Sequence, residues 1–399
     1  MAANWSSMPL DILTFIAFKL ESFDDFIYFS AVCRSWNCAS SSIKHQWRPT
    51  TPLPWLLLAE NTNDNPSCAR KILNLNNNKC YNSNLPETFG ARCWGSPYGW
   101  VAVAKSDHTI QLVNPITNAN ISFPSLETIL NLRDTYAQYF TDYNSFCLTD
   151  FLRKLVVLEV SHAGRKEFVI MIIYQANKYL AFARQGDQSW TDILIKEIKE
   201  TSNIFDVVAM DDHVYVVYDD GEIAYWNVNE FYGLEAIKPM DYSPDKCEIF
   251  EAPVHTDIRT VYLIHSGSDL LMVVRYKENV MNELDTHYDY DIIYRTIYFQ
   301  VYKLNPKERK WEYIEDLGDV MLFVGDNSSM STLLVHDKCL QRNCIYFTDD
   351  ESVEWQMVTE GGGHDMGVYD IKYGQVRRFY EGVDLRSSFC PAIFFIPQL

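Results

Sequence analysis

The chain has 399 residues, of which 47% are hydrophobic and 22% are charged, so it is long enough for a small module and one large domain, and global disorder is excluded. A formal net charge of −19 repels phosphate backbones and anionic lipid, which excludes nucleic acid and membrane surfaces as favoured partners. No apolar run approaches the roughly 18 to 20 residues of a membrane helix. Ten cysteines at irregular spacing, without a secretory leader, predict reduced thiols in a cytoplasmic or nuclear protein.

The first predicted helix begins at Pro9. A missing N–H costs nothing at a first helical position, and Asp11 in the first turn complements the positive end of the helix dipole. Apolar residues then recur at spacings of three and four, which places them on one stripe of the helix. The stripe contains Ile12, Leu13, Ile16 and Leu20.

Two more short helices are expected. Ser22, followed three residues later by Asp25, forms a capping-box pattern that opens a second helix. The apolar side of this helix carries Phe26, Phe29, Val32 and Cys33. A third helix contains Trp36 and runs toward His45. Three helices in about forty residues bury too little surface to be stable alone, so the module needs the following domain or a partner to cover its apolar face.

These residues together resemble the F-box, whose pattern is Leu-Pro, an acidic residue, a Leu/Ile pair, a later Ile and Leu, an Asp, and a closing Val-Cys-Arg-x-Trp. Met8 replaces the usual Leu and suits the same kind of pocket. The resemblance implies an F-box over residues 5–46 that binds Skp1, the adaptor of cullin-based SCF ubiquitin ligases. The implied Skp1-binding residues are Met8, Pro9, Ile12, Leu13, Ile16, Leu20, Val32 and Trp36. The alternative is a helical cap that only packs on the neighbouring domain.

The domain boundary is predicted at residues 47–54. Pro49, Pro52 and Pro54 stop a helix there and favour extended backbone. In residues 55–399, short apolar or alternating runs are separated by Asn, Asp, Gly and Pro, which predicts an all-β domain. Strands are expected at residues 55–58, 69–75, 99–104, 109–113, 156–160, 168–174, 179–183, 204–210, 214–218, 222–226, 260–265, 270–276, 296–304, 320–324 and 344–347.

Three turns of this domain share one shape, in which a strand runs into a turn and a second strand follows. They contain Asn114-Pro115, Asn305-Pro306 leading to Trp311, and residues 185–190, and they resemble the corner between the third and fourth strands of kelch-like propeller blades. At about 40 to 50 residues per blade the domain has room for six or seven blades, and we predict six. The terminal run 391–399 is expected to pair with the first strands and close the ring. A two-sheet sandwich is the alternative fold.

Nearly the whole chain also resembles a plant F-box family whose C-terminal region is a KIB-type β-propeller. The segments that carry this resemblance are residues 99–101, 114–117, 123–124, 317–319, 322–325, 343–350 and 366–370. Their glycines suit turns and their aromatic residues suit strands.

The sequence contains no strong catalytic or metal-binding pattern, and no cofactor is expected. Residues 361–364 are glycine-rich but lack the Lys-Ser/Thr of a phosphate loop, so a flexible loop tip is predicted. His336, Cys339 and Cys344 make three metal ligands, whereas structural zinc requires four.

Two acidic stretches with aromatic residues, 282–294 and 349–364, suit loops that bind another protein. We predict Tyr288, Tyr290 and Trp355 as recognition residues. The resemblance implies a non-catalytic substrate-recognition subunit of an SCF-type ligase, which binds Skp1, and through it a cullin, at one end and a target protein at the other. The alternatives are a propeller enzyme or small-ligand binder with a helical cap, and an F-box scaffold that acts outside ligase assembly.

Overall fold

The fold is that of a computed structural model, which describes residues 5–44, 46–49, 52–60, 69–129, 151–162, 165–174, 177–193, 203–232, 240–242, 258–283, 290–333, 340–352, 355, 361–378, 380 and 385–399. Three helices come first: α1 (Leu10–Phe18), α2 (Phe23–Ala31) and α3 (Arg34–Ile43), preceded by the single turn η1 (Trp5–Ser7). The predicted cap of α2 is confirmed, since the Ser22 hydroxyl accepts a hydrogen bond from the Asp25 amide at 3.1 Å.

The three helices enclose a small aromatic core. Phe26 stacks on Trp47 with ring centroids 4.2 Å apart, and the Trp47 indole donates a hydrogen bond to the Leu20 carbonyl at 3.0 Å. Trp47 therefore packs with the helices, although the sequence places it in the linker. Within the described residues, no helix is long and apolar enough to cross a membrane.

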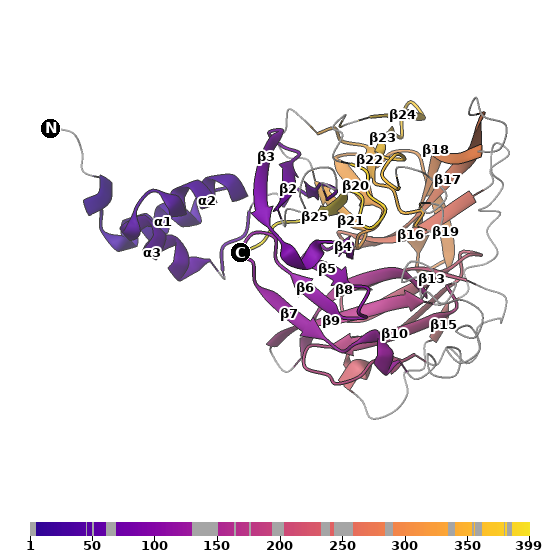
Figure 1. Cartoon of the computed structure of the whole chain (residues 1–399), viewed down its shortest axis with the longest axis horizontal. Helices are drawn as coiled ribbons and strands as arrows, with labels where there is room; N and C mark the ends of the chain where they lie inside the picture. Colours follow the sequence, from indigo (N-terminus) through magenta and orange to yellow (C-terminus); the bar gives the residue numbers. More distant parts are fainter. Residues whose placement is uncertain are drawn as a thin grey trace.

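The described strands of the second domain form six sheets arranged as the blades of a β-propeller (Figure 1), which confirms the predicted fold and blade number and excludes the sandwich. From inner to outer strand, the first blade contains β25 (Ile393–Phe395), β1 (Trp55–Leu57), β2 (Ala69–Asn74) and β3 (Lys79–Asn84), and the second contains β4 (Arg92–Gly95), β5 (Val101–Ala104), β6 (Ile110–Val113) and β7 (Asn120–Phe123). The third contains β8 (Leu152–His162), β9 (Arg165–Tyr174), β10 (Tyr179–Arg184) and β11 (Thr191–Asp192), and the fourth contains β12 (Ile204–Met210), β13 (His213–Tyr218), β14 (Ile223–Asn227) and β15 (Met240–Tyr242).

The fifth blade contains β16 (Ile258–Ser266), β17 (Asp269–Glu283), β18 (Tyr290–Asn305) and β19 (Lys310–Ile314), and the sixth contains β21 (Met330–Leu333), β20 (Val320–Val324), β22 (Cys344–Phe347), β23 (Gly367–Asp370) and β24 (Gln375–Arg377). The sixth differs from the others because β20 and β22 pair in parallel. Single turns η2 (Pro86–Thr88), η3 (Leu126–Thr128) and η4 (Val228–Tyr232) lie between strands.

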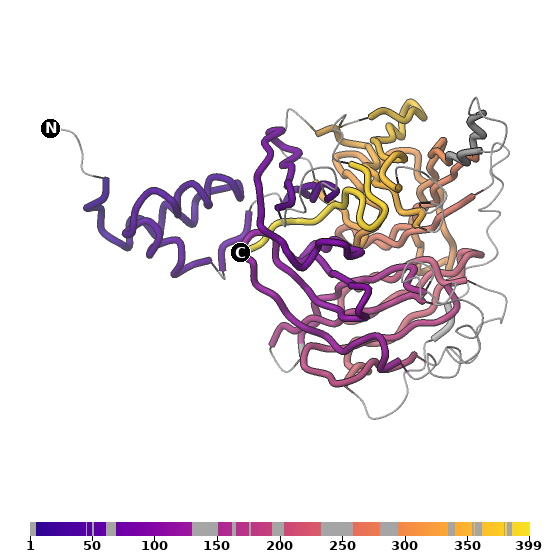
Figure 2. The backbone as a smooth tube through the Cα atoms, in the orientation of Figure 1, coloured from indigo at the N-terminus to yellow at the C-terminus, as the bar shows by residue number. Residues whose placement is uncertain are grey.

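The C-terminal strand closes the ring, as predicted. β25 pairs antiparallel with β1, with Trp55 opposite Phe395 and Leu57 opposite Ile393. Figure 2 shows this yellow segment running in beside the first, violet strands. On its other side β25 approaches β4 so closely that a Cβ on Gly95 would overlap the Phe394 carbonyl. Only glycine permits this approach of two backbones.

The repeated turns lie where the sequence predicts them, between the third and fourth strands of their blades. The Asn114 side chain accepts hydrogen bonds from two amides downstream at 2.9 and 3.0 Å, and Asn305 does the same at 3.1 and 3.2 Å. In such turns the Asn side chain accepts a hydrogen bond from a backbone amide only two or three residues later, so the local sequence is enough to specify them. The two tryptophans that follow such turns bind the preceding blade: the indole of Trp190 donates to the Pro124 carbonyl and that of Trp311 to the Gly221 carbonyl.

The substitution Trp311→Phe tests this contact between blades. We expect it to lower the free energy of unfolding by about 1 to 3 kcal/mol, because it leaves the buried Gly221 carbonyl without its 3.0 Å donor while keeping an aromatic ring in place. Urea unfolding measures the change, and Trp5→Phe at the exposed η1 is the control with no expected effect. Equal midpoints for both variants would contradict the contribution of this hydrogen bond.

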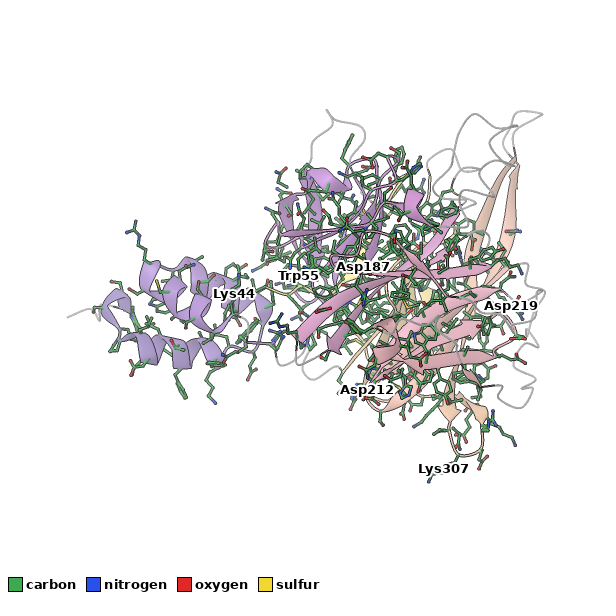
Figure 3. The ribbon with its side chains drawn as sticks, turned by 90° about the horizontal axis from the view of Figure 1, so that it is seen from below. Lys44, Trp55, Asp187, Asp212, Asp219 and Lys307 are labelled. Atoms are coloured by element: carbon green, nitrogen blue, oxygen red, sulfur yellow. The ribbon has the colours of Figure 1, made fainter. Side chains whose placement is uncertain are left out.

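Helix α2 attaches the helical module to the first blade. One oxygen of Asp24 accepts hydrogen bonds from the amides of Asn74 and Asn77 at 2.6 and 2.7 Å, and the other accepts from the Tyr81 hydroxyl at 3.1 Å. Phe23 packs edge-on against Trp55, which Figure 3 shows at the junction of the helical module and the propeller. Polar and aromatic contacts together therefore fix α2 on the turn between β2 and β3.

Candidate functional site

The helical module exposes an unusual amount of apolar side chain. Phe15 is 64% exposed, and Ile12 lies three residues away on the same helix. We call the exposed set of η1, α1 and the end of α2 the apolar helical surface; it consists of Trp5, Leu10, Ile12, Phe15, Phe18 and Val32. Figure 1 shows the module projecting from the side of the propeller, so this surface is not covered by the blades. Several exposed apolar side chains on one small module are typical of an interaction site.

The residues predicted to bind Skp1 divide between this surface and the core beneath it. Pro9, Ile12 and Val32 are exposed, whereas Leu13 is 0% exposed and offers no surface to a partner. Four others, Met8, Ile16, Leu20 and Trp36, are half-buried and pack against the module core. Successive helical residues lie about 100° apart, so the predicted stripe has one edge that faces inward and one that faces outward.

Sequence reasoning missed Trp5, Leu10, Phe15 and Phe18. The available signal was that α1 is apolar on every face, and a core of about forty residues cannot cover such a helix. Trp36 contributes indirectly: its indole donates a hydrogen bond to the Trp5 carbonyl at 3.2 Å, which holds η1 against α3.

The predicted recognition residues of the propeller do not form an exposed site in the described residues. Trp355 is 2% exposed and its indole donates to Asp349 at 3.2 Å, so it is an interior side chain and the prediction of a surface anchor is corrected. Tyr290 begins β18, but its side chain and all of Tyr288 lie outside the described residues. The predicted loop tip is also wrong: Gly362 is buried so tightly that a Cβ would overlap the Trp355 indole.

The propeller instead contains a set of ion pairs, most of them buried, together with a tyrosine hydrogen-bonded to them. We call this set the central ionic network; it consists of Arg92, Lys154, Asp206, Tyr262, Arg275, Lys277, Asp326, Asp350, Glu351 and Asp365. Asp350 accepts hydrogen bonds from Tyr262 at 2.6 Å, Lys277 at 2.9 Å and Arg275 at 3.2 Å. Burial alone would raise the pKa of Asp350, but Lys277 and Arg275 hold it well below its ordinary value. The second arm of Arg275 binds Asp365 at 2.9 Å.

The turn after β20 crosses the middle of the ring. Asp326 pairs with Arg92 at 3.2 Å, and the Ser328 amide donates to the Gly95 carbonyl at 2.8 Å, both on inner strand β4. Ser328 also accepts from the Val157 amide on β8, and Ser329 donates to Asp206 on β12. Burial raises the pKa of Asp326 to about 6 despite the neighbouring Arg92. Residues 325–329 therefore connect the inner strands of three blades across the channel.

Charged side chains in the interior are a requirement of the alternative in which the propeller is an enzyme. The charges are nevertheless committed to one another: Lys154 binds Asp206 at 2.8 Å, and Lys277 binds Glu351 at 2.9 Å. Buried charges that are paired in this way are a common structural feature of protein interiors. Among the residues that the structure describes, no group of three His, Cys, Asp or Glu could hold a metal ion.

Residues 72–370 match the family described as the KIB1-4 beta-propeller, which is about three quarters of the chain. Three similar proteins come from Arabidopsis thaliana: F-box protein SKIP23 is 25% identical, with 97% of this chain and 94% of that protein covered. F-box protein At2g17036 is 24% identical (93% and 89% covered), and F-box/kelch-repeat protein KIB1 is 24% identical (98% and 90% covered). The chain thus belongs to the KIB1-4 β-propeller family.

Proposed function

We propose that this chain is a substrate-recognition subunit of an SCF-type E3 ubiquitin ligase. In this proposal the apolar helical surface binds a Skp1-like adaptor, and through it a cullin, while the propeller binds a target protein. The observation that carries the proposal is that α2 packs on the propeller and leaves Ile12, Phe15 and Val32 exposed. The F-box names of the similar proteins support the identity of the adaptor.

The contribution of such a subunit is positional. It makes and breaks no covalent bond itself; it holds the target near the loaded ubiquitin carrier, so that a bimolecular encounter becomes effectively intramolecular. A fixed joint between the two parts favours this role. The contacts of Asp24 with Asn74, Asn77 and Tyr81, and of Phe23 with Trp55, provide that joint.

The alternative of a propeller enzyme would use side chains of the central ionic network. Removing one charge to make it reactive would leave its partner buried and unpaired, at a cost of several kcal/mol. The pairing of Asp206 with Lys154 and of Asp350 with Lys277 therefore favours a structural role for these residues and a non-catalytic role for the chain.

The double substitution Ile12→Asp and Val32→Asp tests the proposed adaptor binding. Both side chains are exposed, so the helical core stays intact, but two carboxylates would be buried in the complex. We expect the dissociation constant for a Skp1-like adaptor to rise at least about 100-fold. Co-purification of the co-expressed adaptor and titration calorimetry measure the loss.

Val376→Asp on the outer strand β24 is the matched control, because it places the same charge at an exposed apolar position of the propeller. It should leave adaptor binding unchanged. Equal binding by the double variant and the control would overturn the proposal. A reconstituted ubiquitination assay with the cullin complex distinguishes a ligase subunit from a scaffold, which would bind the adaptor without supporting ubiquitin transfer.

A further inference from the structure

A buried cluster with two thiols lies where the ring closes. Cys93 is on β4, the inner strand of the second blade, and Cys390 lies three residues before the start of β25, the inner strand of the first. Each is 1% exposed, and the Cys93 thiol, which donates a hydrogen bond to the Ala91 carbonyl at 3.8 Å, lies beside the Cys390 thiol in the same packed cluster. The strands themselves are held together next to the cluster, where the Ile396 amide donates to the Ser96 carbonyl at 3.0 Å.

The surroundings of this pair favour a thiolate. Nη2 of the buried Arg70 lies 3.5 Å from the Cys390 sulfur, while Nη1 of the same guanidinium has no hydrogen-bond partner. The neighbouring Cys93 thiol and, against the effect of burial, the charge of Arg70 lower the pKa of Cys390 to about 7. A cationic neighbour and a lowered pKa are the features that separate reactive thiols from inert ones.

We propose that Cys93 and Cys390 are a redox pair that forms a reversible disulfide across the closure of the propeller. The oxidant is a hydroperoxide such as hydrogen peroxide. The Cys390 thiolate attacks one peroxide oxygen, the O–O bond breaks, and the leaving hydroxide takes a proton to become water, which leaves a sulfenic acid on Cys390. The Cys93 sulfur then attacks the Cys390 sulfur, and the departing hydroxide takes the Cys93 proton. Two thiols and one peroxide thus give one disulfide and two waters.

The position of the bond determines its effect. It would link β4, the inner strand that comes first in the chain, to the segment before β25, the inner strand that comes last. Nearly the whole domain would then lie within one covalent loop, and a disulfide restricts the unfolded chain most when the loop it closes is long. The pair lies close to the protein surface in the chain, since Ser388 and Phe389, which precede Cys390, are exposed. A small peroxide reaches the pair by local opening of this segment.

The test treats the full-length protein with hydrogen peroxide, blocks free thiols and maps peptides without reduction. We expect a Cys93–Cys390 cross-link and an unfolding temperature several degrees higher, which dithiothreitol restores to its original value. Cys80→Ser, at an exposed cysteine, should behave like the wild type, while Cys93→Ser and Cys390→Ser should show no shift. If both thiols of the oxidised wild type still react with the blocking reagent after unfolding, the proposal is wrong. That result does not depend on whether the serine variants fold or on adaptor binding.

Discussion

Replacing Asp350 with Asn should lower the free energy of unfolding by about 3 to 5 kcal/mol, because the buried Arg275 and Lys277 keep Asp365 and Glu351 but lose the carboxylate that they share. Two cations depend on this carboxylate: Lys277 at 2.9 Å and Arg275 at 3.2 Å, both without solvent-exposed side chain. The neutral amide keeps the shape of the carboxyl group but not its charge. Urea unfolding of the full-length chain measures the loss.

The same substitution should also change the dependence of stability on pH. The pKa of Asp350 is lowered in the folded state by Lys277 and Arg275, against burial. Its stabilising contribution is therefore present above the unfolded pKa of about 4 and is lost as the pH falls below that value. The difference in the free energy of unfolding between the wild type and Asp350→Asn should therefore become smaller as the pH is lowered from 5 to 3. Asp326, whose raised pKa acts in the opposite direction, is present in both proteins and cancels in this difference.

Asp319→Asn provides the matched control. Asp319 pairs with Arg342 at 2.6 Å, a short contact, but both side chains are mostly exposed. Exposed ion pairs contribute about 0 to 1 kcal/mol, so we expect a small change with little dependence on pH. A loss at Asp350 no larger than the loss at Asp319 would show that the central ionic network contributes nothing beyond ordinary surface pairs.

The positions of many strands depend on the local sequence pattern alone, and these strands could be predicted. The strand predicted at 204–210 coincides with β12, and those at 320–324 and 344–347 coincide with β20 and β22. The runs of β20 and β22 are continuous and apolar because both of their faces are buried between blades. Outer strands such as β3 and β24 escaped prediction, since their side chains are almost all exposed and carry no apolar alternation.

The interior polar groups could not be predicted, because their partners are distant in sequence. Asp350 and Tyr262 are 88 residues apart, and Arg92 and Asp326 are 234 apart. The same limit explains the wrong expectation for residues 361–364: glycine-rich sequence suggests a mobile tip, but here glycine is required because the backbone lies against Trp355. For the helical surface, spacing identified the correct helix, whereas which edge of the stripe faces inward depends on how α1 packs.

Phe394→Ala tests the ring closure most directly, and we expect a loss of about 3 to 5 kcal/mol in the free energy of unfolding. Phe394 is 0% exposed on β25, and its ring packs edge-on against Phe323 of the sixth blade at 5.2 Å. The alanine leaves a cavity between the first and sixth blades.

Phe389→Ala is the control, because it removes the same side chain five residues earlier from a position that is 51% exposed. It should change stability by no more than about 0.5 kcal/mol. Thermal and urea unfolding of both variants measure the difference. If the two substitutions cost the same, the C-terminal strand adds little to the ring and the propeller is held closed by its other blades. If only Phe394→Ala is destabilising, the last residues of the chain fix the first blade, and with it the blade on which α2 and the helical module are mounted.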